Sequence, residues 1–248
     1  MKDEAHIQRM LEKQYDFDVK FVLSKARELS SVNNLTIVLA MLALALVAML
    51  IGYVIIYSFN INATTIEDLT KDIANLSDAQ IVITNLSSNI VLAPLFAGLA
   101  MLAISTVRGQ ETKVMNVFSY VSSILPLGVA TMLISIATSL GMQLLLLPGF
   151  YVMMASSFAY PLIIDKRLTP ISAILLSARM TNAYLFQMSM IFLVFVALFI
   201  ATAFTFGLAL IWVGPYFYNV KAVLYTELFC SKEEQPMEEK QQPGVFNA

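Results

Sequence analysis

The stretch LTIVLAMLALALVAMLIGYVIIYSF, residues 35–59, carries no charged side chain and is apolar on all of its helical faces. A helix that crosses the ~30 Å hydrocarbon layer of a bilayer needs about 20 such residues, whereas a core helix of a soluble protein is normally shorter and apolar on one side. The stretch is also longer than the apolar region of a secretory signal peptide. It therefore predicts a retained membrane-spanning helix.

The composition of the whole chain agrees with a membrane protein. Hydrophobic residues make up 58% of the chain and charged residues 13%, against ~45–50% and ~25% in soluble domains. A water-soluble domain is therefore excluded. Transmembrane barrels show segments of roughly ten alternating residues, whereas the apolar runs here are long and continuous, so we expect an all-α transmembrane helix bundle.

Further apolar runs follow the first. The predicted second to sixth spans are Ile90–Val107, Val121–Leu147, Phe150–Ile164, Tyr184–Phe206 and Leu208–Phe229. Pro148 and Gly149 are predicted to break the helix between the third and fourth spans, because proline removes a backbone donor and glycine tolerates unusual dihedral angles. The chain thus divides into a leader (1–34), a six-span membrane domain (35–229) and an acidic tail (230–248) that lacks apolar periodicity and is predicted to be disordered.

Two segments outside the spans have amphipathic patterns. In the leader, apolar residues fall near helical spacing at Phe17, Phe21, Ala26 and Leu29. This pattern fits an interfacial helix and a cytoplasmic helix docked on the bundle equally well. After the fourth span, Thr169 and Pro170 form a helix start, followed by an apolar stripe at Ile171, Ile174, Leu175 and Ala178. We expect this second helix to lie along the cytoplasmic face.

The distribution of lysine and arginine predicts the orientation of the chain. The leader has six of these residues, the 60–89 loop one, the 108–120 loop two, the hairpin at 148 none and the 165–183 loop three. Loops rich in Lys and Arg stay in the cytoplasm. Six spans with both termini cytoplasmic place every basic-rich segment inside, whereas a five-span model without the fourth segment would put Lys166, Arg167 and Arg179 outside.

The chain lacks the motifs of the common enzyme classes. It has no Walker lysine loop, no dinucleotide fingerprint and no Gly-x-Ser-x-Gly elbow. Its one histidine, His6, and its one cysteine, Cys230, leave no metal cluster, so we predict no enzyme, no metal and no cofactor. The net charge of −2 gives no field that would recruit nucleic acid. His6 is predicted to be solvated, and Cys230 is predicted to lie at a membrane surface.

The third span carries a small, weakly polar face. Its members recur at steps of three and four residues: Gly128, Thr131, Ser135, Thr138 and Ser139. Small residues let helix backbones approach closely, so packing is the favoured interpretation. The alternative is a polar pathway bordered by this face and Gln143.

Lys221 is the one ionisable residue well inside an apolar run. A charge within the membrane is a candidate functional residue. However, Lys221 lies about 20 Å along the helix from Leu208, past the bilayer midplane, where a lysine stem can carry its ammonium toward the cytoplasm. We favour this snorkelling interpretation over a substrate or ion site.

A resemblance to a known family rests on residues 144–229. The elements are a Pro-Gly pair at the end of a long span, the stretch TPISAILLSAR, and a Gly, Trp, Pro-Tyr and Tyr pattern in GLALIWVGPYFYNVKAVLYTELF. Here they are Pro148, Gly149, Thr169, Pro170, Ser172, Ala173, Ser177, Gly207, Trp212, Pro215, Tyr216 and Tyr225. This pattern resembles the YciC-like bacterial inner-membrane proteins, which are related to the membrane domain of some glycerophosphodiester phosphodiesterases. The resemblance implies an inner-membrane bundle of about six helices with a role in envelope maintenance, and no phosphodiesterase activity.

Two functions from different classes fit these patterns. The leading hypothesis is a non-enzymatic accessory protein of the inner membrane, with a role in envelope homeostasis. Its expected partners are membrane lipids and other membrane proteins or further copies of the chain. The alternative is a small-solute or ion transporter or channel, in which the face at Thr131, Ser135 and Ser139 borders a pathway with Gln143 and Lys221, and Pro161 and Pro215 kink moving helices.

Overall fold

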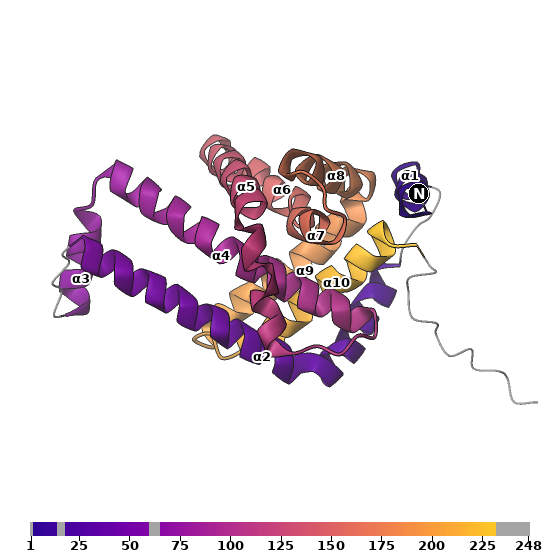
Figure 1. The fold of residues 1–248 in the computed structure, drawn as a ribbon, viewed down its shortest axis with the longest axis horizontal. Coiled ribbons are helices and arrows are strands. Elements are labelled where there is room, and N and C mark those ends of the chain that lie inside the picture. The colour runs from indigo at the N-terminus through magenta and orange to yellow at the C-terminus, as the bar shows by residue number, and fades with distance from the viewer. Residues whose placement is uncertain (1, 14–17, 60–64, 232–248) are drawn as a thin grey trace, which may run out of the picture.

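A computed structural model describes residues 2–13, 18–59 and 65–231 of the chain, and these residues form helices without any strand (Figure 1). The elements in chain order are α1 (Lys2–Leu11), α2 (Val19–Ser58), α3 (Ile66–Ala74), α4 (Asp78–Val107), the 3-10 helix η1 (Val114–Ser123), α5 (Ile124–Leu144), α6 (Leu146–Ala155), α7 (Ala159–Asp165), α8 (Pro170–Ala183), α9 (Leu185–Phe204) and α10 (Leu210–Phe229). The predicted all-α fold is therefore confirmed. Phe17, all but the first two residues of the predicted tail, and part of the 60–89 loop lie outside the described residues.

Five helical segments of the described chain are long and apolar enough to cross a membrane. They are Val19–Ser58, Asp78–Val107, Val114–Leu144, Leu146–Asp165 and Leu185–Phe204. These segments contain the predicted second and fourth spans entirely and nearly all of the first, third and fifth. The predicted sixth span corresponds to α10, which is not among the five because tyrosine, Asn219, Lys221 and Glu227 lower its hydropathy.

The leader and the first predicted span form one continuous helix. α2 starts at Asp18, whose side chain accepts a hydrogen bond from the Lys20 N–H at 2.9 Å, and ends at Ser58. Its 40 residues make it about 60 Å long at 1.5 Å per residue. The helix runs through the predicted boundary between residues 34 and 35, because nothing between the amphipathic and the apolar stretch interrupts the backbone hydrogen bonds.

α2 and α4 extend beyond the other helices. In Figure 1 they reach toward α3, and the second half of α2 and the beginning of α4 are clear of the remaining bundle. α4 begins earlier than the predicted second span because a capping box at Ser77 and Gln80 starts the helix at Asp78. The apolar residues in this part of α2, among them Met49 and Tyr57, are exposed.

The break between α5 and α6 lies earlier in the chain than the sequence predicted. The helix break lies at Leu145, whose backbone is extended, and Pro148 and Gly149 lie in the first turn of α6. Proline is tolerated there because the first N–H groups of a helix have no intrahelical partner. A Cβ on Gly141 would lie 2.9 Å from the Gly149 Cα, so two glycines facing each other allow this close approach.

α10 is the centre of the core. Its buried residues run from Gly214 to Phe229, and it contacts both α2 and α4. Asn219 donates to the Asn33 Oδ1 at 3.1 Å and to the Ser30 Oγ at 2.9 Å, which joins α10 to α2. A helix surrounded by other helices can carry polar side chains, since neighbouring helices satisfy them.

The single histidine and the single cysteine of the chain lie in contacts that the sequence did not predict. His6 is half-buried, and its Nε2 lies 3.0 Å from the backbone oxygen of Glu227, so the expectation of a solvated side chain was wrong. α1 is fixed a second time by Tyr184, whose hydroxyl donates to the Met10 carbonyl at 2.9 Å. Cys230 is buried against neighbouring helices, and its place at a membrane surface stays a prediction.

Candidate functional site

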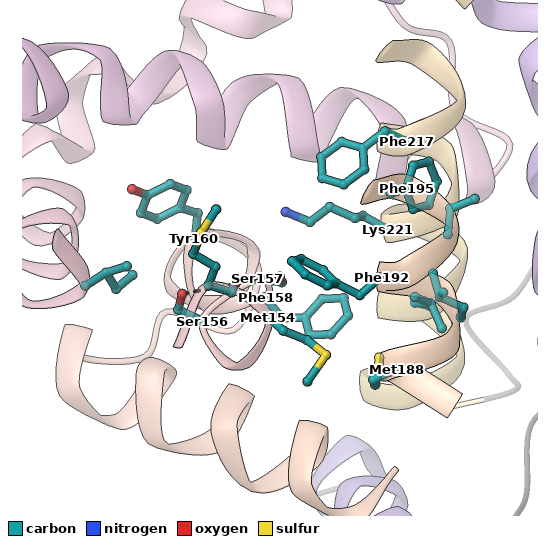
Figure 2. A pocket seen from close by; sticks show the side chains of 15 residues that line it. Met154, Ser156, Ser157, Phe158, Tyr160, Met188, Phe192, Phe195, Phe217 and Lys221 are labelled. Carbon is teal, nitrogen blue, oxygen red and sulfur yellow. Dashed lines mark hydrogen bonds between the residues drawn. The ribbon is translucent and has the colours of Figure 1, made fainter. Parts of the chain in front are cut away.

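The candidate site is a pocket around Lys221 at the side of α10. Lys221 is mostly buried, and its Nζ lies 5.3 Å from the centre of the Phe217 ring. Within the described part of the chain it has no hydrogen bond and no ion pair. Figure 2 shows its side chain directed from α10 toward Tyr160 of α7, into the pocket. A snorkelling side chain would instead follow the helix toward its end.

The pocket is largely apolar. It has a volume of about 320 Å³ and lies between α5, α6, α7, α9 and α10. Its walls are mainly aromatic and methionine side chains, including Phe158, Phe192, Phe195 and Met188. Pockets of this kind, apolar with few polar groups, are typical of small-molecule sites.

A break between two helices exposes polar groups to this pocket. α6 ends at Ala155 and α7 begins at Ala159. The buried hydroxyl of Ser177 on α8 donates to the Ala155 carbonyl at 2.6 Å and accepts from the Phe158 N–H at 3.2 Å, which satisfies the backbone at the break. The break leaves Ser156 and Ser157 on the wall of the pocket.

The hydroxyl groups around the pocket already donate their hydrogens elsewhere. Ser156 donates to the Val152 carbonyl at 2.8 Å, and Ser157 donates to the Met153 carbonyl at 3.0 Å. Thr131 of α5 donates to its own helix, to the Leu127 carbonyl at 2.7 Å, and its oxygen lies 3.0 Å from the Tyr160 hydroxyl. Tyr160 therefore donates to Thr131. The Lys221 ammonium is the one group on the pocket wall whose donor hydrogens are all unused among the described residues.

The structure brings only part of the predicted polar face of α5 toward Lys221. Thr131 is buried and reaches the pocket through Tyr160. Ser135 is half-buried, while Ser139 and Gln143 are exposed, and none of these three lines the pocket. Gly128, which belongs to the predicted face, lies close to Ile90, and Gly141 on the same helix lies close to Gly149.

A second, apolar groove adjoins the pocket. It has a volume of about 480 Å³ and lies between α5, α6 and α8. The stripe predicted for the amphipathic helix, Ile171, Ile174, Leu175 and Ala178, forms its α8 wall. Ile134 and Ser156 line both the groove and the Lys221 pocket, so the two cavities are adjacent at these side chains.

A separate polar cluster joins the ends of α4, α7 and α10. Arg108 donates to both carboxylate oxygens of Asp165, at 2.7 and 2.9 Å, and to the Cys230 Sγ at 3.2 Å. The Tyr225 hydroxyl donates to Asp165 at 2.7 Å, and Lys166 lies 3.7 Å from the same carboxylate. We call these five residues the Asp165 cluster.

The electrostatics of the Asp165 cluster follow from these contacts. The hydrogen bonds to Asp165 raise the pKa of Arg108 above its ordinary value, so its charge is fixed. Burial raises the pKa of the Cys230 thiol, and a raised pKa makes a thiol less reactive. Of the Arg108 nitrogens in the described structure, Nε alone has no partner. A bidentate ion pair with a further hydroxyl donor holds the ends of these helices together, so the role of the Asp165 cluster is structural.

The contacts of the Asp165 cluster were not predicted from the sequence. The available signal was the position of Arg108 and Asp165, each directly after or at the end of an apolar run. Charges that follow different spans on the same side of the membrane can pair, but the sequence does not say which ends of the spans are neighbours. The described residues contain no group of three or more His, Cys, Asp or Glu side chains that could hold a metal ion.

Fold and pocket together define the class of this protein. Its described residues form an all-helical structure with five helices long and apolar enough to cross a membrane, and a largely apolar pocket in which the Lys221 ammonium has no ion-pair partner among these residues. Comparisons with protein-family models, with curated proteins and with solved structures found no match for this chain.

Proposed function

We propose that this protein is a non-enzymatic accessory protein of the bacterial inner membrane that binds a membrane lipid in the Lys221 pocket. The observation that carries the proposal is the Lys221 ammonium, which lies in an apolar pocket near the ring of Phe217 and has no anionic partner among the described residues. An unpaired charge in an apolar environment is unfavourable by several kcal/mol. A bound anion would supply the missing partner.

A lipid fits the walls of this pocket better than a hydrated solute does. The walls are mainly methionine and aromatic side chains, and their hydroxyls are already engaged. A hydrated solute loses its water in such a site and gains few hydrogen bonds in return. An amphiphile brings its own apolar surface, which the pocket and the adjoining groove can cover.

For the membrane arrangement we propose six crossings with both termini in the cytoplasm, in a YciC-like inner-membrane protein with a role in envelope homeostasis. α10 supplies the sixth crossing, since its 20 residues reach about 30 Å. The positions of Lys and Arg support the orientation. Partner membrane proteins, or further copies of the chain, would contact the exposed apolar surface of α2.

The lipid-binding proposal is tested by purification in mild detergent and mass spectrometry of the lipids that remain bound. We expect one lipid class to be enriched over the bulk membrane with the wild-type chain and to be lost with Lys221→Met. The matched control is Lys25→Met, which removes an exposed lysine that pairs with Glu28. Equal lipid content in wild type and Lys221→Met would overturn the proposal. Transport of a small solute by proteoliposomes, abolished in Lys221→Met, would establish the transporter alternative instead.

The arrangement in the membrane is tested with single cysteines in a Cys230→Ala background. We expect an impermeant maleimide applied to intact cells with a permeabilised outer membrane to label Glu67→Cys but not Lys113→Cys or Arg179→Cys. All three side chains are exposed, so burial does not protect them. Labelling of Arg179→Cys from outside would contradict the six crossings.

A further inference from the structure

The charge of the Lys221 pocket matches a ligand that carries one negative charge. Lys221 is the one charged residue on its wall. In a low-dielectric site, a single ammonium balances a monoanion, whereas a dianion leaves one charge uncompensated and is disfavoured. The ligand is therefore a monoanion if the proposed lipid binding is correct, and this inference rests on that function.

The head group that fits is small and rich in hydrogen-bond acceptors. The Lys221 ammonium offers three N–H donors, while Ser156, Ser157 and Tyr160 already donate to other groups. A large head group with several hydroxyls would find few free partners at these walls. A carboxylate, which only accepts hydrogen bonds, matches the donors that are available.

The two cavities together fit one apolar chain. The Lys221 pocket and the α8 groove share Ile134 and Ser156 and are therefore adjacent. A ligand with its head at Lys221 would place its chain past these two side chains, along Ile174 and Leu175 of the groove. The pocket, at about 320 Å³, lies near the lower end of ligand sites, which range from about 300 to 1,000 Å³. The size favours one chain over the two chains and glycerol backbone of a phospholipid.

We infer that the site binds a single-chain amphiphile with a carboxylate head, of the long-chain fatty acid class, with the carboxylate at the Lys221 Nζ and the chain in the α8 groove. The ammonium forms a charge-assisted hydrogen bond with the carboxylate. The acyl chain of the ligand covers the apolar wall of α8. The side chains of Ile171 and Leu175 on this wall are exposed in the protein alone.

Binding of radiolabelled palmitate to the purified, delipidated full-length protein tests this inference. We expect unlabelled palmitate to compete, and three other compounds to compete weakly: methyl palmitate, which lacks the charge; hexadecyl phosphate, which carries up to two charges; and phosphatidylglycerol, which has two chains. Competition by methyl palmitate as strong as that by palmitate would overturn the role of the carboxylate.

Two substitutions locate the ligand. Lys221→Met should weaken palmitate binding by about tenfold to a hundredfold, the range that one charge-assisted hydrogen bond contributes, and Lys221→Arg should retain most of it. Leu175→Trp fills the groove and should weaken palmitate binding without changing the fold, because Leu175 is half-exposed. Leu140→Trp is the matched control, since Leu140 is equally exposed on α5 but lines neither cavity.

The outcomes separate this inference from the proposed function. Displacement of radiolabelled palmitate by phosphatidylglycerol at lower concentrations than by unlabelled palmitate, with palmitate binding lost in Lys221→Met, would overturn the fatty acid assignment and leave lipid binding in place. Palmitate binding that is identical in wild type and Lys221→Met would overturn both. Weaker binding in Leu140→Trp as well as Leu175→Trp would overturn the placement of the chain in the α8 groove.

Discussion

Two charged regions of α10 lie one helical turn apart and differ in how their charge is compensated. At Tyr225 the helix joins the Asp165 cluster, in which the carboxylate accepts hydrogen bonds from both Arg108 and Tyr225. At Lys221 the helix carries an ammonium that lies near the ring of Phe217 and has no anionic partner in the part of the chain that the structure describes. The first region contains both hydrogen-bond donors and a carboxylate that accepts from them, while the second, among the described residues, contains donors without an anion.

This difference indicates which buried charge stabilises the fold and which can bind a ligand. A buried ion pair holds helices together only when its partners come from the protein itself, as they do from α4, α7 and α10 in the Asp165 cluster. An unpaired buried charge adds nothing to stability and is unfavourable until an anion binds. The two regions should therefore respond to substitution in opposite directions.

The largest effect is expected for Asp165→Asn. The substitution leaves the mostly buried Arg108 guanidinium without its anion, and breaking a buried pair in this way destabilises by about 3–5 kcal/mol. Thermal unfolding in detergent measures the loss. Glu28→Gln is the control, because the exposed pair of Glu28 with Lys25 contributes at most ~1 kcal/mol. An equal, small decrease in unfolding temperature for both variants would mean that the Asp165 cluster does not stabilise the fold.

Lys221→Met is expected to act in the other direction. Removal of an unpaired charge from an apolar pocket should stabilise the delipidated protein by about 1–3 kcal/mol, less the contribution of the contact with Phe217. The measurement is the unfolding temperature of wild type and variant without added lipid. With bound lipid, the order should reverse, because only the wild type gains stability from the ligand. A destabilised Lys221→Met in the absence of lipid would show that Lys221 has a structural partner.

Cys230 offers a chemical test of the Asp165 cluster through its pH dependence. Burial raises the pKa of the thiol, and the thiolate is the reactive form. The labelling rate by a permeant maleimide should therefore still rise above pH 9, where an exposed cysteine with its ordinary pKa of about 8.5 has levelled off. At neutral pH, each unit of pKa increase slows labelling about tenfold.

The control for this rate is Lys113→Cys in a Cys230→Ala background, because Lys113 is exposed and near the same end of α4. Asp165→Asn should accelerate labelling of Cys230 by opening the cluster. Equal pH profiles for Cys230 and the exposed control would contradict the burial of the thiol.

The smallest effect is expected for Asn219→Leu, which removes the hydrogen bonds between Asn219 of α10 and the polar side chains of α2. Asn33 then loses the Asn219 oxygen at 3.3 Å and the Asn219 Nδ2 at 3.1 Å. Interhelical hydrogen bonds in membrane proteins contribute about 0.6 kcal/mol on average and up to ~1.7 kcal/mol. The unfolding temperature should fall slightly, and palmitate binding should stay unchanged because Asn219 does not line the pocket. Loss of binding in this variant would place the ligand at the α2 side of α10 instead.

The helices of this chain could largely be predicted, but their contacts could not. The apolar runs predicted the segments in α2, α4, α5 and α9, and Thr169 with Pro170 predicted the start of α8. The break between α5 and α6 came earlier than Pro148, because proline fits within the first turn of a helix. The α8 stripe, expected along the cytoplasmic face, forms one wall of an apolar groove against α5 and α6.

The candidate site was predicted in part. Lys221 stood out because it is a charge within an apolar run, yet the sequence favoured snorkelling over a site. Which of these applies depends on where the side chain points and what surrounds it. α7 and α9 place Tyr160, Phe192 and Phe195 around the ammonium, and no spacing along the chain predicts that these three meet.

By itself, the sequence determined that this chain folds as helices with long apolar stretches, since backbone groups in hydrocarbon must find their hydrogen-bond partners within the same segment. That requirement is local, so it can be read from one segment at a time. Only the tertiary structure decided which charges are paired, because partners such as Arg108 and Asp165 come from helices far apart in the chain. The same packing left Lys221 without a partner, and this is the feature on which the proposed function depends.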